Sequence, residues 1–268
     1  MEIMSKVELR NVVANNKTAT FQSFSELENG ARFRIGWELF RLQVRLIFSH
    51  KFIWFMLGLT AWLGLMYYFN FRTDAVFRMT QRNVIEDLIY LPMVVLAVFL
   101  NMQLITAEKD NRTLEVMFTT SGSQFKVWLL KAATLGTILY FITLAICVVA
   151  FFGFTDMAIL ATSFYAFVPI YFIANLTLYF AVRMKSGLAA GMVTAAVLVI
   201  LFFSNAIMEE TDLYKYMLFL NPYSSPLRVD PATWEVWIWQ NKIGVLILGT
   251  GLLYAALRSM GNRERLLR

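Results

Sequence analysis

The sequence predicts an all-α integral membrane protein with six transmembrane helices. Hydrophobic residues make up 59% of its 268 residues and charged residues only 16%, whereas an average soluble domain carries about 25% charged residues. The apolar residues gather in six runs of roughly 20 residues, the length of helix that crosses a bilayer. Lysine and arginine gather in alternate loops between these runs, which is the charge pattern of multi-pass membrane proteins.

Each predicted span follows one apolar run. The six runs cover residues 52–69, 88–107, 132–154, 157–182, 187–207 and 236–257. Pro92 and Pro169 fall inside the second and fourth runs, where neighbouring membrane helices can satisfy the carbonyls that proline leaves free. The sixth run contains Lys242. We expect its long side chain to carry the ammonium group to the membrane surface.

The distribution of basic residues predicts the orientation of the chain. If the N-terminus is cytoplasmic, the inside segments are residues 1–51, 108–131, 183–186 and 258–268, and they hold 18 of the 24 Lys and Arg residues. Basic residues accumulate in cytoplasmic loops. Both termini are therefore predicted to lie in the cytoplasm, and topology rather than nucleic-acid binding explains the net charge of +6.

The chain before the six-span domain (52–257) divides into two predicted parts, and a basic tail (258–268) follows the domain. Residues 1–30 are polar and are either disordered or docked on a partner. Residues 31–51 carry a charged and an apolar helical stripe, formed by Arg34, Glu38, Arg41 and Arg45 and by Phe33, Trp37, Phe40, Val44 and Ile47. Inserting four charges into a bilayer costs about 10 kcal/mol or more. We therefore expect an interfacial helix, acting either as a surface anchor alone or as an anchor that also contacts a cytosolic subunit.

The outside segment before the sixth run is predicted to contain one short helix. It starts at a Thr211 cap, places Leu213, Met217 and Leu220 on one face and stops at Asn221 before a proline. We expect this helix to dip against the outer leaflet and to be followed by a proline-containing loop.

Motifs for catalysis and metal binding are missing from the sequence. It contains no G-x-x-x-x-G-K-[ST] phosphate loop, no G-x-S-x-G elbow and no H-E-x-x-H pair. Cys147 and His50 are the single cysteine and the single histidine, so an intrachain disulfide is impossible. We predict no catalytic residue, no metal site and no cofactor in this chain.

Four polar residues inside the runs are candidates for a translocation path: Asn101, Gln103, Ser204 and Asn205. Polar groups in lipid are costly and usually face other helices or a cavity. Hydrogen bonding between helices and a substrate path are both open interpretations for them.

The stretch AEKDNRTLEVMFTT at 107–120 interrupts the apolar pattern with charge. Thr113, Val116, Met117 and Thr120 share one helical face, Asp110 or Asn111 can cap the start, and Gly122 suits the end. Glu108 and Arg112 lie four residues apart and can pair. The stretch is either a short amphipathic helix in the first cytoplasmic loop or an ordinary solvated loop.

This arrangement resembles the type-2 permease subunits of ATP-binding-cassette exporters. Those subunits have six spans, an N-terminal interfacial elbow helix, a cytoplasmic coupling helix between spans two and three, and an external re-entrant helix before span six. The positions that match their loop motif are Glu108, Lys109, Thr113, Glu115, Val116, Met117, Thr119 and Lys131. Arg112 replaces the usual glycine and Ser121 the usual proline. The resemblance covers roughly residues 31–258.

The resemblance implies a partner ATPase that holds ATP and Mg and receives the helix at 108–122, so the chain is not an enzyme by itself. The residues implied in coupling are Glu108, Arg112, Thr113, Glu115, Met117 and Phe118, flanked by Arg34, Glu38, Arg41 and Arg45 of the connecting helix. In the family spans two and five line the path, which favours Asn101, Gln103, Ser204 and Asn205. A second permease chain, either an identical copy or a paralogue, completes the assembly.

The function implied is ATP-driven export of an amphiphilic cargo, such as a lipid, drug or lipopeptide, across the bacterial cytoplasmic membrane. Polysaccharide or ion-linked export by the same architecture stays open. So does a membrane scaffold or sensor that anchors an ATPase without moving cargo. A membrane enzyme is a third alternative, against which the missing catalytic motifs weigh.

Overall fold

The computed structural model describes residues 50–74, 78–110, 124–184, 186–209, 212–226 and 229–260, together with Trp37, Phe40 and Arg41. The chain divides into two compact units, Met1–Gln43 and Val44–Arg268. In the first unit, the rings of Trp37 and Phe40 stack with centroids 5.6 Å apart. All the elements below belong to the second unit.

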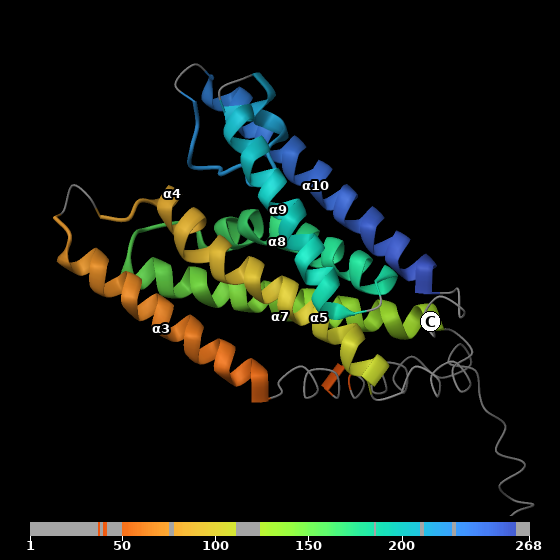
Figure 1. Ribbon diagram of the computed structural model, residues 1–268. Helices are drawn as coiled ribbons and strands as arrows, with labels where there is room; N and C mark the ends of the chain where they lie inside the picture. The colour runs from red at the N-terminus through yellow and green to blue at the C-terminus, as the bar shows by residue number, and fades with distance from the viewer. Residues whose placement is uncertain are drawn as a thin grey trace, which may run out of the picture. The chain divides into compact units, whose positions relative to one another are not determined.

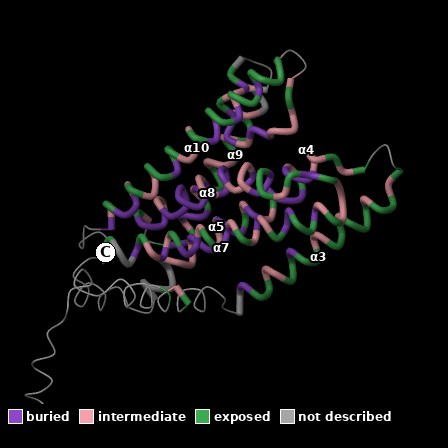
Figure 2. The backbone as a smooth tube through the Cα atoms, turned by 180° about the vertical axis from the view of Figure 1, so that it is seen from behind, coloured by how far each residue is buried: buried purple, intermediate pink, exposed green. Residues whose placement is uncertain are grey.

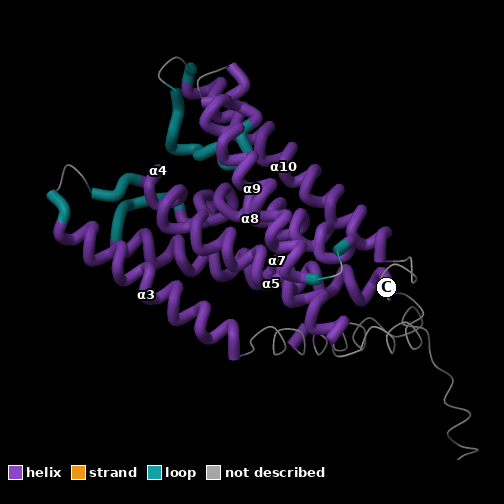
Figure 3. The backbone as a smooth tube through the Cα atoms, in the orientation of Figure 1, coloured by secondary structure: helices purple, strands orange, loops and turns teal. Residues whose placement is uncertain are grey.

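Every regular element among the described residues of the second unit is a helix, and these residues contain no strand (Figures 1 and 3). In chain order the elements are α3 (His50–Arg72), α4 (Gln81–Asn83), the π-helix η2 (Val84–Tyr90), α5 (Leu91–Asp110), α7 (Gln124–Gly153), α8 (Ile159–Arg183), α9 (Gly187–Glu209), the 3₁₀ helix η3 (Asp212–Tyr216) and α10 (Pro231–Met260).

Six of these helical segments are long and apolar enough to cross a membrane, as the sequence predicts. They are Phe52–Arg72, Gln81–Leu104, Trp128–Gly153, Ile159–Arg183, Gly187–Asn205 and Pro231–Met260. The helices extend beyond several of the predicted spans. In particular, α7 begins at Gln124 and α10 at Pro231, because polar end turns keep their helical hydrogen bonds beyond the apolar run that marks a span in the sequence.

Helix α8 is the central helix of the second unit. It contacts α5, α7, α9 and α10, and 56% of its most apolar stretch is buried. Its interior polar groups bond within the helix, where the Thr177 hydroxyl donates to the Ile173 carbonyl and the Asn175 amide to the Tyr171 carbonyl. The buried donor groups of Thr177 and Asn175 therefore both have an acceptor, as buried polar groups require.

The second membrane-length segment starts earlier than the sequence predicts and changes its helix type along its length. It begins at Gln81 in α4 and widens into the π-helix η2, and α5 then contains Pro92. A proline ring collides with the carbonyl four residues earlier in a regular α-helix. The carbonyl four residues before Pro92 belongs to Leu88, which lies in η2 and not in a regular α-helix.

Helix α3 has the least buried surface of the membrane-length helices. Only 11% of its most apolar stretch is buried, and most of it is exposed or half-buried in Figure 2. Its C-terminal end is held by two contacts. The Tyr67 ring packs edge-on against Phe154 at 6.0 Å, and Asn70 Oδ1 accepts a hydrogen bond from the Met79 backbone N–H. Phe52 and Leu59 of α3 are buried in the core, whereas its exposed apolar side chains, such as Trp54 and Phe71, are available to lipid or to another chain.

Candidate functional site

Two adjacent polar residues of α10 hold the segment that precedes it, which consists of η3 and the turns after it. Lys242 Nζ donates to the Leu220 carbonyl at 2.8 Å. Asn241 Nδ2 donates to the carbonyls of Lys215 at 3.0 Å and Met217 at 2.8 Å. We call these two side chains and three carbonyls the α10 clamp. It supplies side-chain donors to backbone carbonyls of η3 and of the turns that follow it.

The position of Lys242 corrects the prediction from the sequence. We expected its ammonium group at the membrane surface, but the side chain is fully buried at 0% exposure. The physical reason is the Leu220 carbonyl, which the fold places within reach of the side chain. A buried carbonyl without a donor costs about 1–3 kcal/mol, so Lys242 reaches the chain interior instead of the surface.

The segment at 212–226 is also bonded to α4, η2 and α8, and by a further bond to α10. Asn221 Nδ2 donates to the Arg82 carbonyl at 3.1 Å and to Glu86 Oε1 at 3.0 Å, which joins the segment to α4 and η2. The Thr162 and Tyr223 hydroxyls bond at 2.7 Å, which joins it to α8. Trp234 Nε1 of α10 donates to the Pro222 carbonyl at 2.9 Å.

The helix predicted before the sixth span differs from the observed one. A 3₁₀ helix occupies Asp212–Tyr216 and ends well before Asn221. Leu213 is half exposed, and Tyr214 takes the buried position beside Met217 and Leu220. A 3₁₀ helix turns every three residues, so the buried face differs from that of the predicted α-helix. The expected dip into the outer leaflet stays a prediction.

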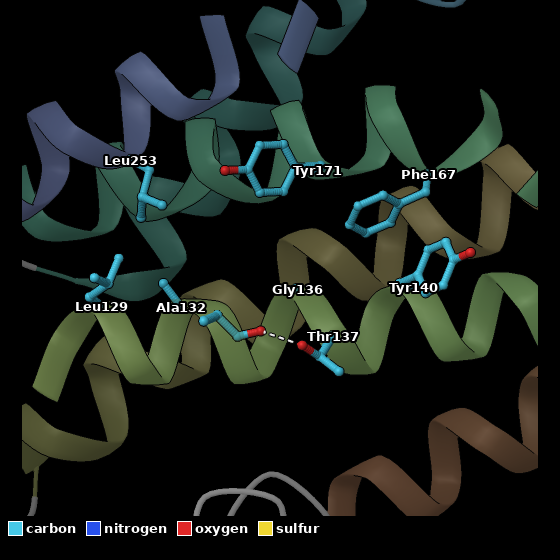
Figure 4. A pocket seen from close by; sticks show the side chains of 9 residues that line it. Leu129, Ala132, Gly136, Thr137, Tyr140, Phe167, Tyr171 and Leu253 are labelled. Atoms are coloured by element: carbon cyan, nitrogen blue, oxygen red, sulfur yellow. Dashed lines mark hydrogen bonds between the residues drawn. The ribbon is translucent and has the colours of Figure 1, made fainter. Parts of the chain in front are cut away.

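A groove of about 410 Å³ opens between α7, α8 and α10 (Figure 4). Its lining is Leu129, Ala132, Ala133, Gly136, Thr137, Tyr140, Phe167, Tyr171 and Leu253. The space exists because the α7 side of the groove consists largely of small residues, opposite the aromatic rings of α8. We call it the α7–α8–α10 groove.

The chemistry of this groove is apolar and aromatic, with hydroxyl groups at its edges. The Tyr140 and Phe167 rings meet edge-on at 5.3 Å, and Phe167 lies 5.8 Å from the Tyr171 ring. The Tyr171 hydroxyl lies 3.4 Å from Thr250 Oγ1 of α10. No charged side chain is among the lining residues. The groove suits an apolar chain or ring.

The four predicted path residues lie on two helices that pack together, α5 and α9. A Cβ atom on Gly191 of α9 would meet the side chain of Met102 of α5, so Asn101 and Gln103 lie near the N-terminal end of α9. Ser204 lies about 20 Å further along α9 at 1.5 Å per residue, and Asn205 follows it. The structure therefore does not bring the two pairs together.

Two of these four side chains use bonds inside their own helices. Asn101 is buried at 2% exposure and donates to the Ala97 carbonyl at 2.8 Å. The Ser204 hydroxyl donates to the Ile200 carbonyl at 2.8 Å. Gln103 and Asn205 are half-buried. Bonds within a helix account for the tolerance of Asn101 and Ser204 in an apolar setting.

Most of the predicted coupling and connecting residues fall outside the described part of the chain. Glu108 lies in the last turn of α5, so this residue continues the second membrane-length helix. Arg112, Thr113, Glu115, Met117 and Phe118 lie outside the described residues, as do Arg34, Glu38 and Arg45. Arg41 is described and exposed. The coupling and elbow helices stay predictions.

The α10 clamp and the α7–α8–α10 groove are the features that sequence reasoning missed. The sequence did contain a signal for the clamp, because Asn241 and Lys242 are adjacent polar residues in an apolar helix. Buried amide and ammonium groups need nearby acceptors. The groove had no such signal. Among the described residues, no group of three or more His, Cys, Asp or Glu side chains is placed to hold a metal ion.

Comparisons with models of protein families, with curated proteins and with solved structures found no match to this chain.

Proposed function

We propose that the chain is the membrane-spanning permease subunit of an ATP-driven exporter of the type-2 ATP-binding-cassette class. The observation that carries the proposal is the charged stretch at 107–120, placed between the second and third membrane-length helices. Helix α5 ends at Asp110 and α7 begins at Gln124. The segment between them has the length and the sequence pattern of a coupling helix that a partner ATPase receives.

In this proposal the ATPase is a separate subunit that binds ATP and Mg. Its closure on ATP moves two permease chains relative to each other, and the second chain is an identical copy or a paralogue. The exposed apolar surfaces of α3 and α9 offer area for such a neighbour within the bilayer. They include Trp54, Phe71, Met192, Phe202 and Phe203.

An amphiphilic cargo is the substrate class that we propose. The α7–α8–α10 groove supports this choice, because it combines aromatic and aliphatic walls with hydroxyl groups and has no charge. Such a lining suits the apolar part of a lipid, drug or lipopeptide. A polysaccharide would call for many hydrogen-bonding groups, which this groove does not supply among its described lining residues.

Reconstitution with a phosphate-loop ATPase tests the proposal. The chain and an ATPase encoded beside it are co-expressed, purified together and placed in vesicles, and ATP hydrolysis and movement of a fluorescent lipid are measured in parallel. The proposal expects a stable complex, with lipid movement that depends on ATP. ATP hydrolysis in a stable complex that moves no amphiphile, sugar polymer or ion would favour a scaffold or sensor instead.

A further inference from the structure

A second groove, of about 190 Å³, lies where η3 meets α10. Its lining is Lys215, Tyr216, Gln240, Asn241, Gly244, Val245 and Leu248. The α10 members follow one face of the helix, so the groove runs along the helix axis. One end carries a lysine and two side-chain amides, and the other end is formed by glycine, valine and leucine. We call it the η3–α10 groove.

The cation at the polar end is Lys215. Its Nζ lies 5.1 Å from the centre of the Tyr216 ring and 5.8 Å from that of the Trp237 ring. The only ion pair among the described residues joins Arg82 and Glu86. Aromatic faces hold an ammonium group but do not neutralise its charge, so Lys215 still offers a charge to an anion at the mouth of the groove.

The depth of the groove in a bilayer follows from the length of α10. Its 30 residues span about 45 Å, against about 30 Å of hydrocarbon. Arg258 in the last turn marks one membrane surface, and the opposite surface is reached about 20 residues earlier, near residue 238. Trp237 and Trp239 lie at that level, as tryptophan does at the headgroup boundary.

This depth places the polar end of the groove among lipid headgroups and its apolar end beside the acyl chains. We propose that the η3–α10 groove binds one anionic phospholipid, with the phosphate between Lys215 Nζ and the Gln240 amide and an acyl chain along Gly244 and Leu248. Charge complementarity selects the headgroup. A Cβ atom at Gly244 would meet nothing within 4 Å, so space for the chain exists beside the helix. The inference does not depend on the proposed transport function.

Native mass spectrometry of the full chain tests the site, because it counts bound lipids. The purified protein is titrated with phosphatidylglycerol and with phosphatidylcholine of the same acyl chains. The first phosphatidylglycerol should bind at least fivefold more tightly than phosphatidylcholine. Lys215→Gln should weaken it about fivefold, which corresponds to about 1 kcal/mol for one lysine near a membrane surface, and Lys215→Arg should retain it. Equal binding of the two lipids by the wild-type protein would overturn the proposal.

Two matched controls separate the groove from general effects. Arg72 also lies over an aromatic ring, 5.1 Å from the centre of Tyr68, and Arg72→Gln should leave the first lipid unchanged. Gly244→Leu fills the groove and should abolish the first lipid adduct. Gly251→Leu, on the same helix and equally without a neighbour within 4 Å, should not. The two pairs are Lys215→Gln with Arg72→Gln, and Gly244→Leu with Gly251→Leu. If both variants of one pair lose the lipid adduct, or if Gly244→Leu keeps it, the proposed site is wrong. Displacement of the lipid by inorganic phosphate alone would show an anion site without a lipid.

Discussion

The Lys242 ammonium donates a hydrogen bond to the Leu220 carbonyl oxygen at 2.8 Å, and the lysine side chain is fully buried. Twenty-two positions separate the two residues in the chain. The bond joins a membrane-length helix to the segment at 212–226, which contains η3 and the turns that follow it. Charged residues inside membrane helices usually mark a site with a specific partner, and here the partner is the protein backbone.

Replacing Lys242 by methionine is expected to loosen the segment at 212–226. The variant keeps an apolar stem of similar length but leaves the Leu220 carbonyl without its donor, at a cost of about 1–3 kcal/mol. The thermal midpoint in detergent should fall, and amide exchange should rise in this segment more than in α8. Ser204→Ala serves as a control, because its hydroxyl bonds only within its own helix. Unchanged exchange at 212–226 would show that the clamp does not hold the segment.

Asn221 is expected to couple this segment to η2. Asn221→Ala removes the bonds to the Arg82 carbonyl and Glu86 Oε1 and the bond that Asn221 Oδ1 accepts from the Tyr223 N–H. We expect a loss of about 1–3 kcal/mol in unfolding free energy.

Asn221→Asp has the same shape and should destabilise at least as much, because its carboxylate faces Glu86. Glu86→Ala removes two interactions, the hydrogen bond from Asn221 and the ion pair with Arg82. Loss of the ion pair should lower the unfolding free energy by less than about 1 kcal/mol, because the pair is exposed. Thermal unfolding of the two single variants and the Asn221→Ala/Glu86→Ala double variant measures the coupling. Additive losses would contradict a direct interaction.

Two glycines of α10 provide a matched test of its packing on α8. A Cβ atom at Gly249 would lie 3.1 Å from the Tyr171 ring and 3.3 Å from the Phe172 Cα, whereas one at Gly251 would meet nothing within 4 Å. Gly249→Ala should therefore lower the unfolding free energy by about 1–3 kcal/mol. Gly251→Ala should be neutral or stabilising by up to about 1 kcal/mol. Equal thermal midpoints for the two variants would mean that α8 and α10 are not in close contact there.

Charge reversal in the loop at 107–120 tests the proposed coupling to an ATPase. Glu108→Lys together with Glu115→Lys should abolish ATP hydrolysis that depends on the permease, because reversing both charges removes the electrostatic match that the proposed docking requires. Membrane insertion should be intact, as checked by the amount of monodisperse protein extracted from membranes. Lys126→Glu, outside the motif, is the control. Full hydrolysis with the double variant would remove the role given to this loop.

Filling the α7–α8–α10 groove tests whether it takes part in cargo movement. Gly136 lines the groove, and a Cβ atom there would meet nothing within 4 Å. Gly136→Leu should reduce movement of a fluorescent lipid at least tenfold and leave assembly with the ATPase unchanged, because the added side chain occupies the groove. Gly58→Leu on α3, which is equally free of neighbours, should transport normally. Equal transport by both variants would exclude the groove from the path.

The second membrane-length helix begins before the apolar run at 88–107 that predicts its span. The charged residues Arg82, Glu86 and Asp87 precede that run. In the structure Arg82 Nε pairs with Glu86 Oε1 at 3.1 Å, one helical turn away. Asn221, more than a hundred residues later, bonds to both residues. The spacing of Arg82 and Glu86 is a local signal of helix, whereas only the folded chain brings the Asn221 amide to these two residues.

The sequence by itself determined the six helices able to cross a membrane that the described part of the chain contains. Apolar length is counted along the chain, and each helix satisfies its own backbone hydrogen bonds without help from distant residues. Tertiary structure alone decided that Lys242 points inward, that Tyr214 rather than Leu213 is buried, and that small residues of α7 face the rings of α8 across a groove. These outcomes depend on which donors, acceptors and volumes meet across helices, and that information is absent from any single stretch of sequence.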